Sequence, residues 1–279
     1  MSVEKEGASK SFNGVVDAFC ENKVYQIVLN QPDSRNPLSR EMMDGLGQAL
    51  QDGIEHPTAR VIVFSARGRA FCAGGNLSNV ADRLAEPAGP DGRDPLAVNN
   101  RVYGYLLECI VKCPKPTVAM VQGAAMGGGA GLACATDIVI ANQRSFFGFP
   151  EARIGLVPAQ ILPFVVARIG LRHARRMFLT GERASAVQAH HIGIVDYLED
   201  SSEMFKARLH QVCQMLILAG PHALSTTKVL LNNVFEMDRW YEQGLSAFLD
   251  ESAEHFAVQF RGEAQEGIAA AREKRQPNW

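Results

Sequence analysis

The sequence predicts an α/β protein with a layered core followed by a helical C-terminal region. As far as about residue 196, short apolar runs rich in β-formers alternate with helical patterns. Alternating strands and helices favour parallel strand pairing. Beyond that point the strand signals stop, and helical periodicity covers residues 203–219, 221–235, 237–259 and 262–275. We therefore expect a core over residues 1–200 and a helical region over residues 201–279.

Four strands and one helix of the core are expected from local pattern. The strands cover residues 24–30, 60–65, 117–122 and 137–141, which are apolar and bounded by turn signals. Residues 39–54 have apolar side chains at helical spacing, with Ser39 as a suitable N-cap. Residues 85–95 contain three prolines, two glycines and four charges, a composition that predicts a loop or lid.

Composition indicates a soluble globular protein. The chain has 279 residues, 47% hydrophobic and 21% charged, with a net charge of −2 and a pI of about 6.4. This charge balance disfavours an overall basic surface for nucleic acid. Residues 117–135 are uncharged and long enough to span a membrane, but they contain five glycines. A buried strand, a glycine loop and a buried helix explain this stretch better, and the N-terminus lacks the apolar core of a secretory signal. We expect a cytoplasmic protein without a membrane partner.

The cysteines give no indication of a metal site. They lack CxxC pairs and zinc-type spacing with histidine, so we expect reduced, mostly buried thiols and no bound metal. The six are Cys20, Cys72, Cys109, Cys113, Cys134 and Cys213.

Two glycine-rich turns carry the strongest chemical signal. The first is FCAGGN, residues 71–76, and the second is Gly127-Gly128-Gly129, directly after the predicted strand 117–122. Glycine lets a ligand approach the backbone, and a turn that opens a helix presents N–H groups at the positive helix end. Two such turns can aim two N–H groups at one oxygen, as in an oxyanion hole. Tight connections without a ligand remain an alternative, whereas neither turn fits a complete phosphate-loop motif.

Five segments together resemble the crotonase, or enoyl-CoA hydratase/isomerase, superfamily, and they occur in that family's order. The resemblance runs from about residue 15 to the end of the chain and includes FCAGGN, VQGAAMGGGAGLACATDIVIA, FFGFPEARIGLVP, TGERASAVQAHHIGIVD and EGIAAAREKRQP. It implies a crotonase-like ββα spiral core with a helical trimerisation region. It also implies an acyl-CoA thioester substrate, no separate cofactor because coenzyme A is part of the substrate, and a homotrimer or dimer of trimers.

The resemblance assigns roles residue by residue. The N–H groups of Gly75 and Gly128 match the oxyanion donors, and Glu151 matches the second catalytic glutamate. Arg35 matches a turn near coenzyme A, and Lys274 matches a lysine that approaches the nucleotide from a neighbouring subunit; solvated surface charges remain the alternative for both. The expected substrate-lining residues are Ala73, Gly74, Asn76, Gly127, Gly131, Phe149, Pro150 and Gln160.

One position departs from the common hydratase pattern. The first of the family's two glutamates is replaced by Gly131, twenty positions before Glu151. The apolar run between Pro150 and Ile154 predicts a raised pKa for Glu151, which suits a group that takes and returns a proton. A single-base isomerase, a one-glutamate hydratase and a degenerate acyl-CoA-binding homologue all remain compatible with the loss.

The turn at residues 158–163 favours hydration. PAQILP, followed by FVV, resembles hydratases of branched glutaconyl-CoA esters, the isohexenylglutaconyl-CoA type of terpene breakdown more closely than the 3-methylglutaconyl-CoA type of leucine breakdown. Such a substrate carries a distal carboxylate, for which Arg83, Arg153 and Arg168 are candidate partners. The alternatives are a Δ3,Δ2-enoyl-CoA isomerase and a non-enzymatic acyl-CoA- or RNA-binding homologue, with the acidic pI against RNA.

Overall fold

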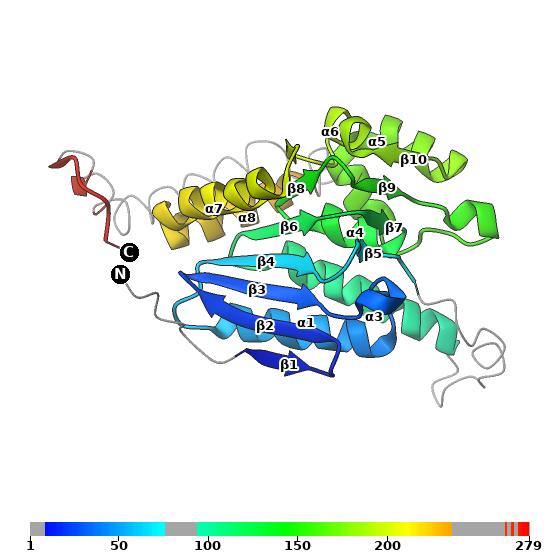
Figure 1. The fold of residues 1–279 in the computed structure, drawn as a ribbon, viewed down its shortest axis with the longest axis horizontal. Coiled ribbons are helices and arrows are strands. Elements are labelled where there is room, and N and C mark those ends of the chain that lie inside the picture. Colours follow the sequence, from blue (N-terminus) through cyan, green and yellow to red (C-terminus); the bar gives the residue numbers. More distant parts are fainter. Residues whose placement is uncertain (1–8, 76–93, 236–265, 267–268, 271–272, 279) are drawn as a thin grey trace, which may run out of the picture.

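The computed structural model describes residues 9–75, 94–235, 266, 269–270 and 273–278. Their strands form two sheets (Figure 1). The larger has the order β1-β2-β3-β4-β6-β8-β11, with β1 (Lys10–Phe12), β2 (Val16–Glu21), β3 (Val24–Leu29), β4 (Val61–Ala66), β6 (Thr117–Val121), β8 (Ile138–Asn142) and β11 (Tyr197–Glu199). The smaller has the order β10-β9-β7-β5, with β10 (Arg183–Ser185), β9 (Phe146–Gly148), β7 (Ala124–Met126) and β5 (Ala70–Cys72).

The predicted parallel α/β arrangement is confirmed for most of the larger sheet. Strands β3, β4, β6, β8 and β11 pair in parallel, and the four strands expected from sequence are β3, β4, β6 and β8. The exceptions are two antiparallel pairings, of β1 with β2 and of β2 with β3. β2 and β3 form a hairpin. Its two-residue loop consists of Asn22 and Lys23, with φ of 51° and 64°. Positive φ at both loop residues is the geometry that matches the twist of a two-residue hairpin.

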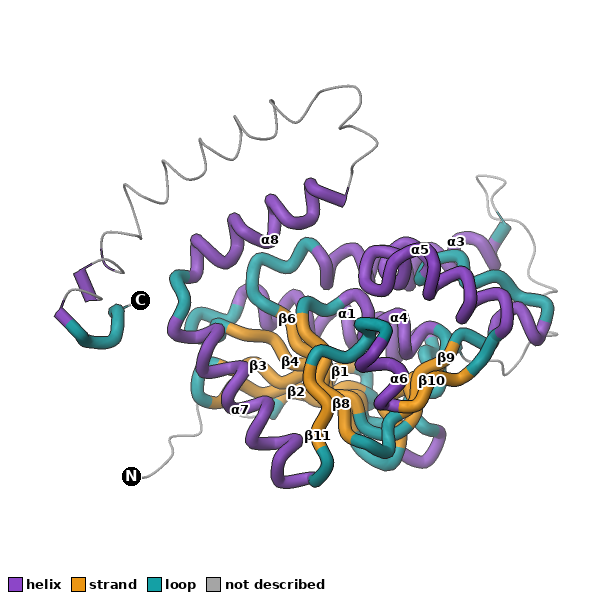
Figure 2. The backbone as a smooth tube through the Cα atoms, turned by 90° about the horizontal axis from the view of Figure 1, so that it is seen from above, coloured by secondary structure: helices purple, strands orange, loops and turns teal. Residues whose placement is uncertain are grey.

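Alternating residues of β4 place hydrophobic layers on both faces of the larger sheet. Ile62 and Phe64 belong to the cluster that includes the buried side of α1 (Arg40–Glu55). Val61 and Val63 belong to a second cluster with α7 (Ser202–Leu218). Since successive side chains of a strand point to opposite faces, α1 and α7 cover opposite faces of the sheet (Figure 2). Helix α7 is therefore a layer of the core.

The remaining helices connect or cover the two sheets. The Ser39 side chain caps α1 by accepting a hydrogen bond from the Met42 N–H at 3.2 Å, as predicted. The predicted loop at residues 85–95 lies outside the described residues except at its end, where Asp94 caps α3. The other elements are η1 (Pro32–Ser34), α3 (Pro95–Val111), α4 (Gly128–Ala135), η2 (Glu151–Ile154), α5 (Leu162–Thr180), α6 (Ala186–His191) and α8 (Pro221–Phe235).

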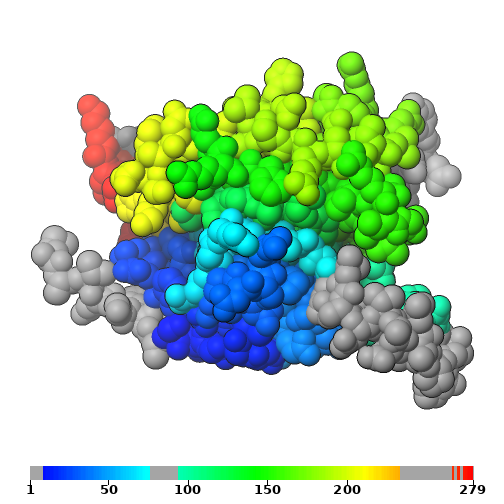
Figure 3. All heavy atoms as spheres, turned by 45° about the vertical axis from the view of Figure 1, so that its right-hand side comes forward, coloured from blue at the N-terminus to red at the C-terminus, as the bar shows by residue number. Residues whose placement is uncertain are grey.

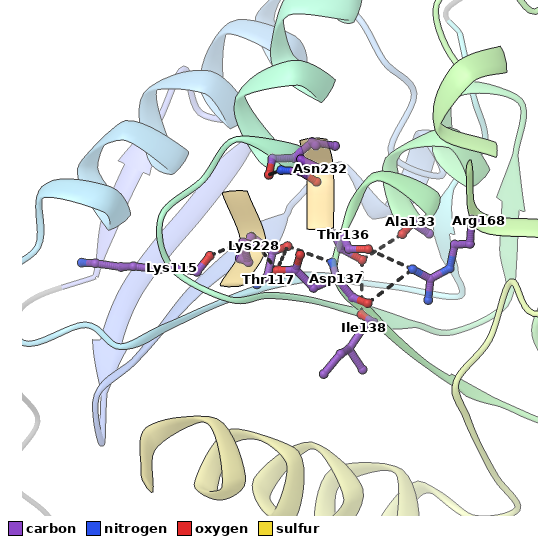
Figure 4. Close-up of polar contacts among 10 residues, drawn as sticks. Lys115, Thr117, Ala133, Thr136, Asp137, Ile138, Arg168, Lys228 and Asn232 are labelled. Atoms are coloured by element: carbon purple, nitrogen blue, oxygen red, sulfur yellow. Dashed lines mark hydrogen bonds and ion pairs between the residues drawn. The ribbon is translucent and has the colours of Figure 1, made fainter. Parts of the chain in front are cut away.

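A polar network fastens α8 to the strands of the core (Figure 4). Asp137 Oδ2 accepts hydrogen bonds from the Thr117 N–H at 2.7 Å and the Lys228 Nζ at 2.5 Å. Asn232 Nδ2 donates to the Val111 carbonyl at 3.1 Å. The helix predicted over residues 221–235 is thus held against the core, whereas the helices predicted over residues 237–259 and 262–275 lie wholly or largely outside the described residues. Within the described part of the chain, no helix combines the length and apolar character of a membrane span.

The smaller sheet lies beside the larger one and carries the predicted chemistry. On the face shown in Figure 3, the cyan segment that contains β4 and β5 lies between the blue N-terminal strands and the green segment. β5 directly follows β4 in the chain and pairs with β7 in parallel. The sequence signal for β5, β7 and β9 was weak because each strand has three residues, too few to display a period.

Candidate active site

Three neighbouring strands of the smaller sheet deliver the predicted catalytic segments to one edge. β5 pairs with β7 in parallel, with Cys72 opposite Ala125, and β7 pairs with β9 in parallel, with Met126 opposite Gly148. The chain leaves β5 into the first glycine turn, β7 into the second, and β9 toward Glu151. Because the carboxyl ends of parallel strands meet at one edge, these three segments lie side by side.

The first glycine turn is held from two sides. Gly74 has φ of 96°, and a β-carbon there would lie 2.7 Å from the Met126 carbonyl oxygen, so only glycine fits. The Ala73 N–H donates to the Arg35 carbonyl at 2.9 Å, and the Leu38 N–H donates to the Gly74 carbonyl at 2.8 Å. The turn that contains Arg35 therefore lies directly beside the first glycine turn, and the exposed Arg35 side chain is free to meet solvent or a ligand.

A buried asparagine fixes the Arg35 turn, and the sequence analysis did not identify it. Asn36 is fully buried, with φ of 53°. Its Nδ2 donates to the carbonyls of Arg67 and Ala70, each at 3.0 Å, and its Oδ1 accepts from the Gln31 N–H at 2.7 Å. Asparagine is among the few residues that adopt this left-handed conformation readily, and this was the signal available in the sequence.

The second glycine turn opens α4 and leaves donors free. Gly127 has φ of 51°, and its N–H donates to the Gly148 carbonyl at 2.8 Å. Helix α4 begins at Gly128. Among the described residues, neither the Gly75 N–H nor the Gly128 N–H has a hydrogen-bond acceptor. Two unoccupied donors on adjacent turns, one at a helix N-terminus, are what an oxyanion hole requires.

The Gly128 Cα is closely packed by two side chains. A β-carbon on Gly128 would lie 2.5 Å from Leu38 Cδ1 and 3.3 Å from Tyr103 Cε1. Tyr103, a buried residue of α3, also donates its hydroxyl to the Gly128 carbonyl at 2.5 Å. Tyr103 could not be singled out from the sequence, because an aromatic residue on an apolar helix face has the same pattern whether it packs a core or supports a site.

Glu151 lies at the start of η2 with its carboxylate against the second turn. A β-carbon on Gly127 would lie 2.7 Å from Glu151 Oε1. Oε2 is buried and has no hydrogen-bond partner among the described residues. Burial raises the pKa of the Glu151 carboxyl above its ordinary value. The direction of the shift is the one expected from the sequence, but residues 152–157 are exposed, so the burial comes from the contact with the second turn and not from that apolar run. A carboxyl with a raised pKa can both accept and return a proton.

Ile161 occupies the place that a side chain at position 131 would need. Gly131 is buried in α4, and a β-carbon there would lie 2.3 Å from Ile161 Cγ2. Ile161 is itself buried and ends the turn that began at Pro158. The expectation that Gly131 lines the acyl site is therefore revised, because Ile161 covers it. An apolar group stands where the common hydratase pattern has its first glutamate.

Comparisons with known proteins show the family of this chain. The model of the enoyl-CoA hydratase/isomerase family matches residues 20–279. The chain belongs to the enoyl-CoA hydratase/isomerase family. A crystal structure of an enoyl-CoA hydratase/isomerase from Marinobacter aquaeolei is 36% identical, with a TM-score of 0.88, covering 95% of this chain and 99% of that one. Pseudomonas aeruginosa AtuE is 37% identical, with a TM-score of 0.84 and coverages of 94% and 98%.

The curated relatives include both reaction names. A Thermus thermophilus protein named as an enoyl-CoA hydratase is 35% identical over 259 residues, 91% of this chain and 96% of its own length. The 1,2-epoxyphenylacetyl-CoA isomerase of Escherichia coli is 30% identical over 258 residues, with coverages of 85% and 95%. The predicted crotonase fold and the prediction of an enzyme of this family are confirmed, whereas the reaction and the acyl group remain to be inferred.

Phe149, one of the residues expected to line the substrate site, has a packing role in the structure. It is fully buried, and its ring centroid lies 4.7 Å from that of Phe178 on α5. Phe149 therefore anchors the segment that carries Pro150 and Glu151, and its burial does not support direct substrate contact.

Gln160 lies against α3. A β-carbon on Gly104 would lie 2.0 Å from Gln160 Oε1 and 2.5 Å from Arg101 Nη1. The Arg101 guanidinium also lies 3.8 Å from the centroid of the Tyr105 ring and forms an ion pair with Glu108. The sequence analysis did not name Arg101, which the fold brings to the turn at residues 158–161.

Two of the arginines proposed for a distal carboxylate are engaged elsewhere. Arg168 Nε donates to the Ile194 carbonyl at 2.9 Å, and its guanidinium pairs with Asp196. Arg153 Nε donates to the Thr180 carbonyl at 2.8 Å. Both side chains join backbone segments, so the structure gives them structural roles. Arg83 lies outside the described residues, as does Asn76.

Lys274 is exposed in the C-terminal segment, with φ of 54°. In Figure 1 that red segment lies at the opposite end of the molecule from β5 and β7. Within one chain it does not approach the glycine turns, so its role at a neighbouring subunit's coenzyme A stays a prediction.

In the part of the chain that the structure describes, no group of three His, Cys, Asp or Glu residues forms a potential metal site. Cys109 is exposed, and the other five cysteines are buried.

Proposed function

We propose that this chain is a hydratase that adds water across the double bond of a 3-substituted glutaconyl-CoA, with Glu151 as its acid/base group. The observation that carries the proposal is the combination of two features. One carboxylate oxygen of Glu151 is buried without a hydrogen-bond partner among the described residues, and the apolar Ile161 fills the position of the common first glutamate. One carboxylate then handles both proton transfers, since the other position offers no titratable group.

The proposed reaction proceeds through a thioester enolate. The thioester oxygen lies between the Gly75 and Gly128 N–H groups, which stabilise the negative charge that develops there. Water attacks C3 while Glu151 takes one of its protons, and the double-bond electrons move to the thioester oxygen. The enolate then collapses, and protonated Glu151 delivers that proton to C2. The product is the 3-hydroxyacyl thioester, and Glu151 is again ionised.

The substrate class rests on the turn at residues 158–163 and on its position. This turn, which resembles that of branched glutaconyl-CoA hydratases, supplies Ile161 beside Gly131. Isohexenylglutaconyl-CoA is our first choice of substrate and 3-methylglutaconyl-CoA the second. The apolar side chain of Ile161 is suited to contact a branched hydrocarbon tail. The carboxylate of a second glutamate at position 131 would be costly to bury beside it.

The distal carboxylate of such a substrate needs a cationic partner, for which we propose Arg101. Its Nη1 lies near Gln160 on the α3 side of the turn, and its ion pair with Glu108 is partly exposed. A substrate carboxylate would share this guanidinium with Glu108. Arg101→Gln should then raise KM for carboxylated esters and leave KM for crotonyl-CoA nearly unchanged.

A Δ3,Δ2-enoyl-CoA isomerase is the second candidate, because one carboxylate also suffices to move a proton along an acyl chain. A panel of CoA esters tests both: isohexenylglutaconyl, 3-methylglutaconyl, crotonyl and 3-enoyl thioesters, followed by absorbance of the conjugated thioester and by product mass. Hydration adds the mass of one water and removes the conjugation. Isomerisation keeps the mass and creates conjugation. Turnover of the 3-enoyl ester alone would overturn the hydratase proposal.

We further propose a homotrimer or a dimer of trimers that binds coenzyme A as part of the substrate, without a separate cofactor. Arg35 supports the nucleotide side of this proposal, since its turn is bonded to the first glycine turn through Ala73. Lys274 would complete the site from a neighbouring subunit.

A further inference from the structure

Tyr103 makes a buried contact with the second glycine turn that the reaction scheme above does not use. Its hydroxyl donates to the Gly128 carbonyl at 2.5 Å, and its ring lies beside the Gly128 Cα. Tyr103 is 7% exposed, so the contact is shielded from water. Burial, together with nearby acidic groups that include Glu151, raises the pKa of Tyr103, which keeps the phenol protonated and able to donate.

The contact acts on a stretch of backbone made of glycine alone. Gly127, Gly128 and Gly129 are consecutive, and glycine has more conformational freedom than any other residue. The donor N–H of Gly128 belongs to the peptide between Gly127 and Gly128. On its N-terminal side, the Gly127 N–H is fixed by the Gly148 carbonyl at 2.8 Å. The carbonyl of that peptide, on Gly127, accepts a hydrogen bond from the Gly131 N–H at 3.0 Å. On its C-terminal side, the Gly128 carbonyl accepts from the Tyr103 hydroxyl.

We propose that Tyr103 is a positioning residue that holds the Gly128 N–H in line with the thioester oxygen. The inference rests on the proposed oxyanion role of Gly128. An oxyanion donor stabilises charge efficiently only if its direction is fixed before the reaction. Tyr103 supplies that constraint from α3, whereas Gly148 supplies it from β9.

A plain packing role for Tyr103 predicts something different. The ring alone would then matter, and loss of the hydroxyl would lower stability without changing how the thioester carbonyl is polarised. Tyr103→Phe separates these roles, because it keeps the ring and removes the donor. Tyr25→Phe is a matched control. Tyr25 is a buried tyrosine of β3 in the larger sheet, and its hydroxyl donates to Asp52 and not to either glycine turn.

The direct readout is the absorption of a bound conjugated thioester. Hexa-2,4-dienoyl-CoA absorbs at longer wavelength when its carbonyl oxygen accepts strong hydrogen bonds. The spectra are recorded in a Glu151→Gln background, in which hydration is slow. We expect a red shift on binding to that background and to its Tyr25→Phe derivative, and a clearly smaller shift with Tyr103→Phe. In the Glu151-containing enzyme, Tyr103→Phe should lower kcat about 10-fold while KM changes less than about 2-fold, because the enolate needs the donor more than the substrate does.

The outcomes are distinguishable. If the Glu151→Gln protein binds the dienoyl thioester without any red shift, the oxyanion role of the proposed function is wrong. If that shift is present and Tyr103→Phe retains it in full, the inference about Tyr103 is overturned while the proposed function stands. If the Phe variant does not fold by circular dichroism, 3,5-difluorotyrosine at position 103 takes its place. Its hydroxyl is a stronger donor, so the inference requires a larger red shift than that of tyrosine, and an unchanged shift overturns it.

Discussion

Glu151 lies so close to Gly127 that a β-carbon on the glycine would be 2.7 Å from the carboxylate oxygen Oε1. The proposed general base and the second glycine turn therefore share one small space, in which we propose that the thioester carbonyl and the attacked double bond bind. Glycine at position 127 serves two purposes: it permits a φ of 51°, and it leaves room for the carboxylate.

Replacing Glu151 should lower the rate of the reaction and preserve the binding of CoA esters. Glu151→Gln preserves the shape of the side chain but cannot take a proton, and loss of general acid–base catalysis costs about 10²–10⁴-fold in rate. We expect at least the lower end, with CoA-ester affinity nearly intact by isothermal titration calorimetry. Glu182→Gln, at a partly exposed carboxylate paired with Arg176, is the control and should remain near wild type. Wild-type turnover in the Glu151 variant would remove this residue from the mechanism.

The same variant should reveal the cost of the buried charge. The pKa of Glu151 is raised in the folded protein, from an ordinary value of 4.5. Below about pH 4.5 the carboxyl is protonated in both folded and unfolded states, so it carries no charge penalty. As pH rises through the folded pKa, the native state must ionise a desolvated group, and wild-type stability falls relative to Glu151→Gln. We expect the Tm of the variant to exceed that of wild type at pH 8, and this gain to shrink toward pH 4.5. A constant difference across that range would contradict the assignment.

A side chain at Gly128 should abolish turnover. In Gly128→Val the β-carbon would collide with Leu38 Cδ1 and press on the Tyr103 ring, which displaces the N–H donor and obstructs the thioester. Loss of an oxyanion donor elsewhere costs about 10²–10³-fold, so at least that loss is expected here, with circular dichroism near wild type. Gly47→Ala is the control, because a β-carbon at that position of α1 meets nothing within 4 Å. It should preserve activity and stabilise the helix by about 0.5–1 kcal/mol.

Restoring a glutamate at position 131 should require removal of Ile161. Gly131→Glu alone forces a buried charge against Ile161 Cγ2, and overpacking of a core typically costs about 1–3 kcal/mol. We expect lower stability and lower activity on every ester. Combined with Ile161→Gly, the glutamate has room, and the ratio of crotonyl-CoA to branched-ester kcat/KM should rise above that of wild type. Ile161→Gly alone is the control for the lost side chain. If the double variant gives the same ratio as this control, position 131 does not face the reacting carbons.

Assembly gives an independent check on the proposed CoA site. Mass photometry at micromolar concentration should show a trimer or hexamer, and Lys274→Ala should raise KM for every CoA ester alike because it acts on the nucleotide. A monomer with full activity would contradict a contribution of Lys274 from a neighbouring subunit.

The family and the residue types of the candidate site could be predicted from the amino-acid sequence alone. The strands at residues 24–29, 61–66, 117–121 and 138–142 were predictable because their apolar runs and turn signals are local properties of the chain. The two glycine turns and Glu151 were recognisable because their chemistry requires particular residue types at particular spacings. Ser39 was predictable as a cap for the same local reason.

The tertiary structure decided which groups meet. Ile161 covers Gly131, Tyr103 bonds to the Gly128 carbonyl, and Arg101 lies beside Gln160, although the members of each pair are far apart in the chain. Arg168 was a candidate ligand for a carboxylate until the fold brought Asp196 and the Ile194 carbonyl to it. Local patterns report the burial and conformation of a residue, but they carry no information on its long-range partners. Those partners follow from the parallel order of β5, β7 and β9 and from the packing of α3 and α5 beside α4, which only the folded chain defines.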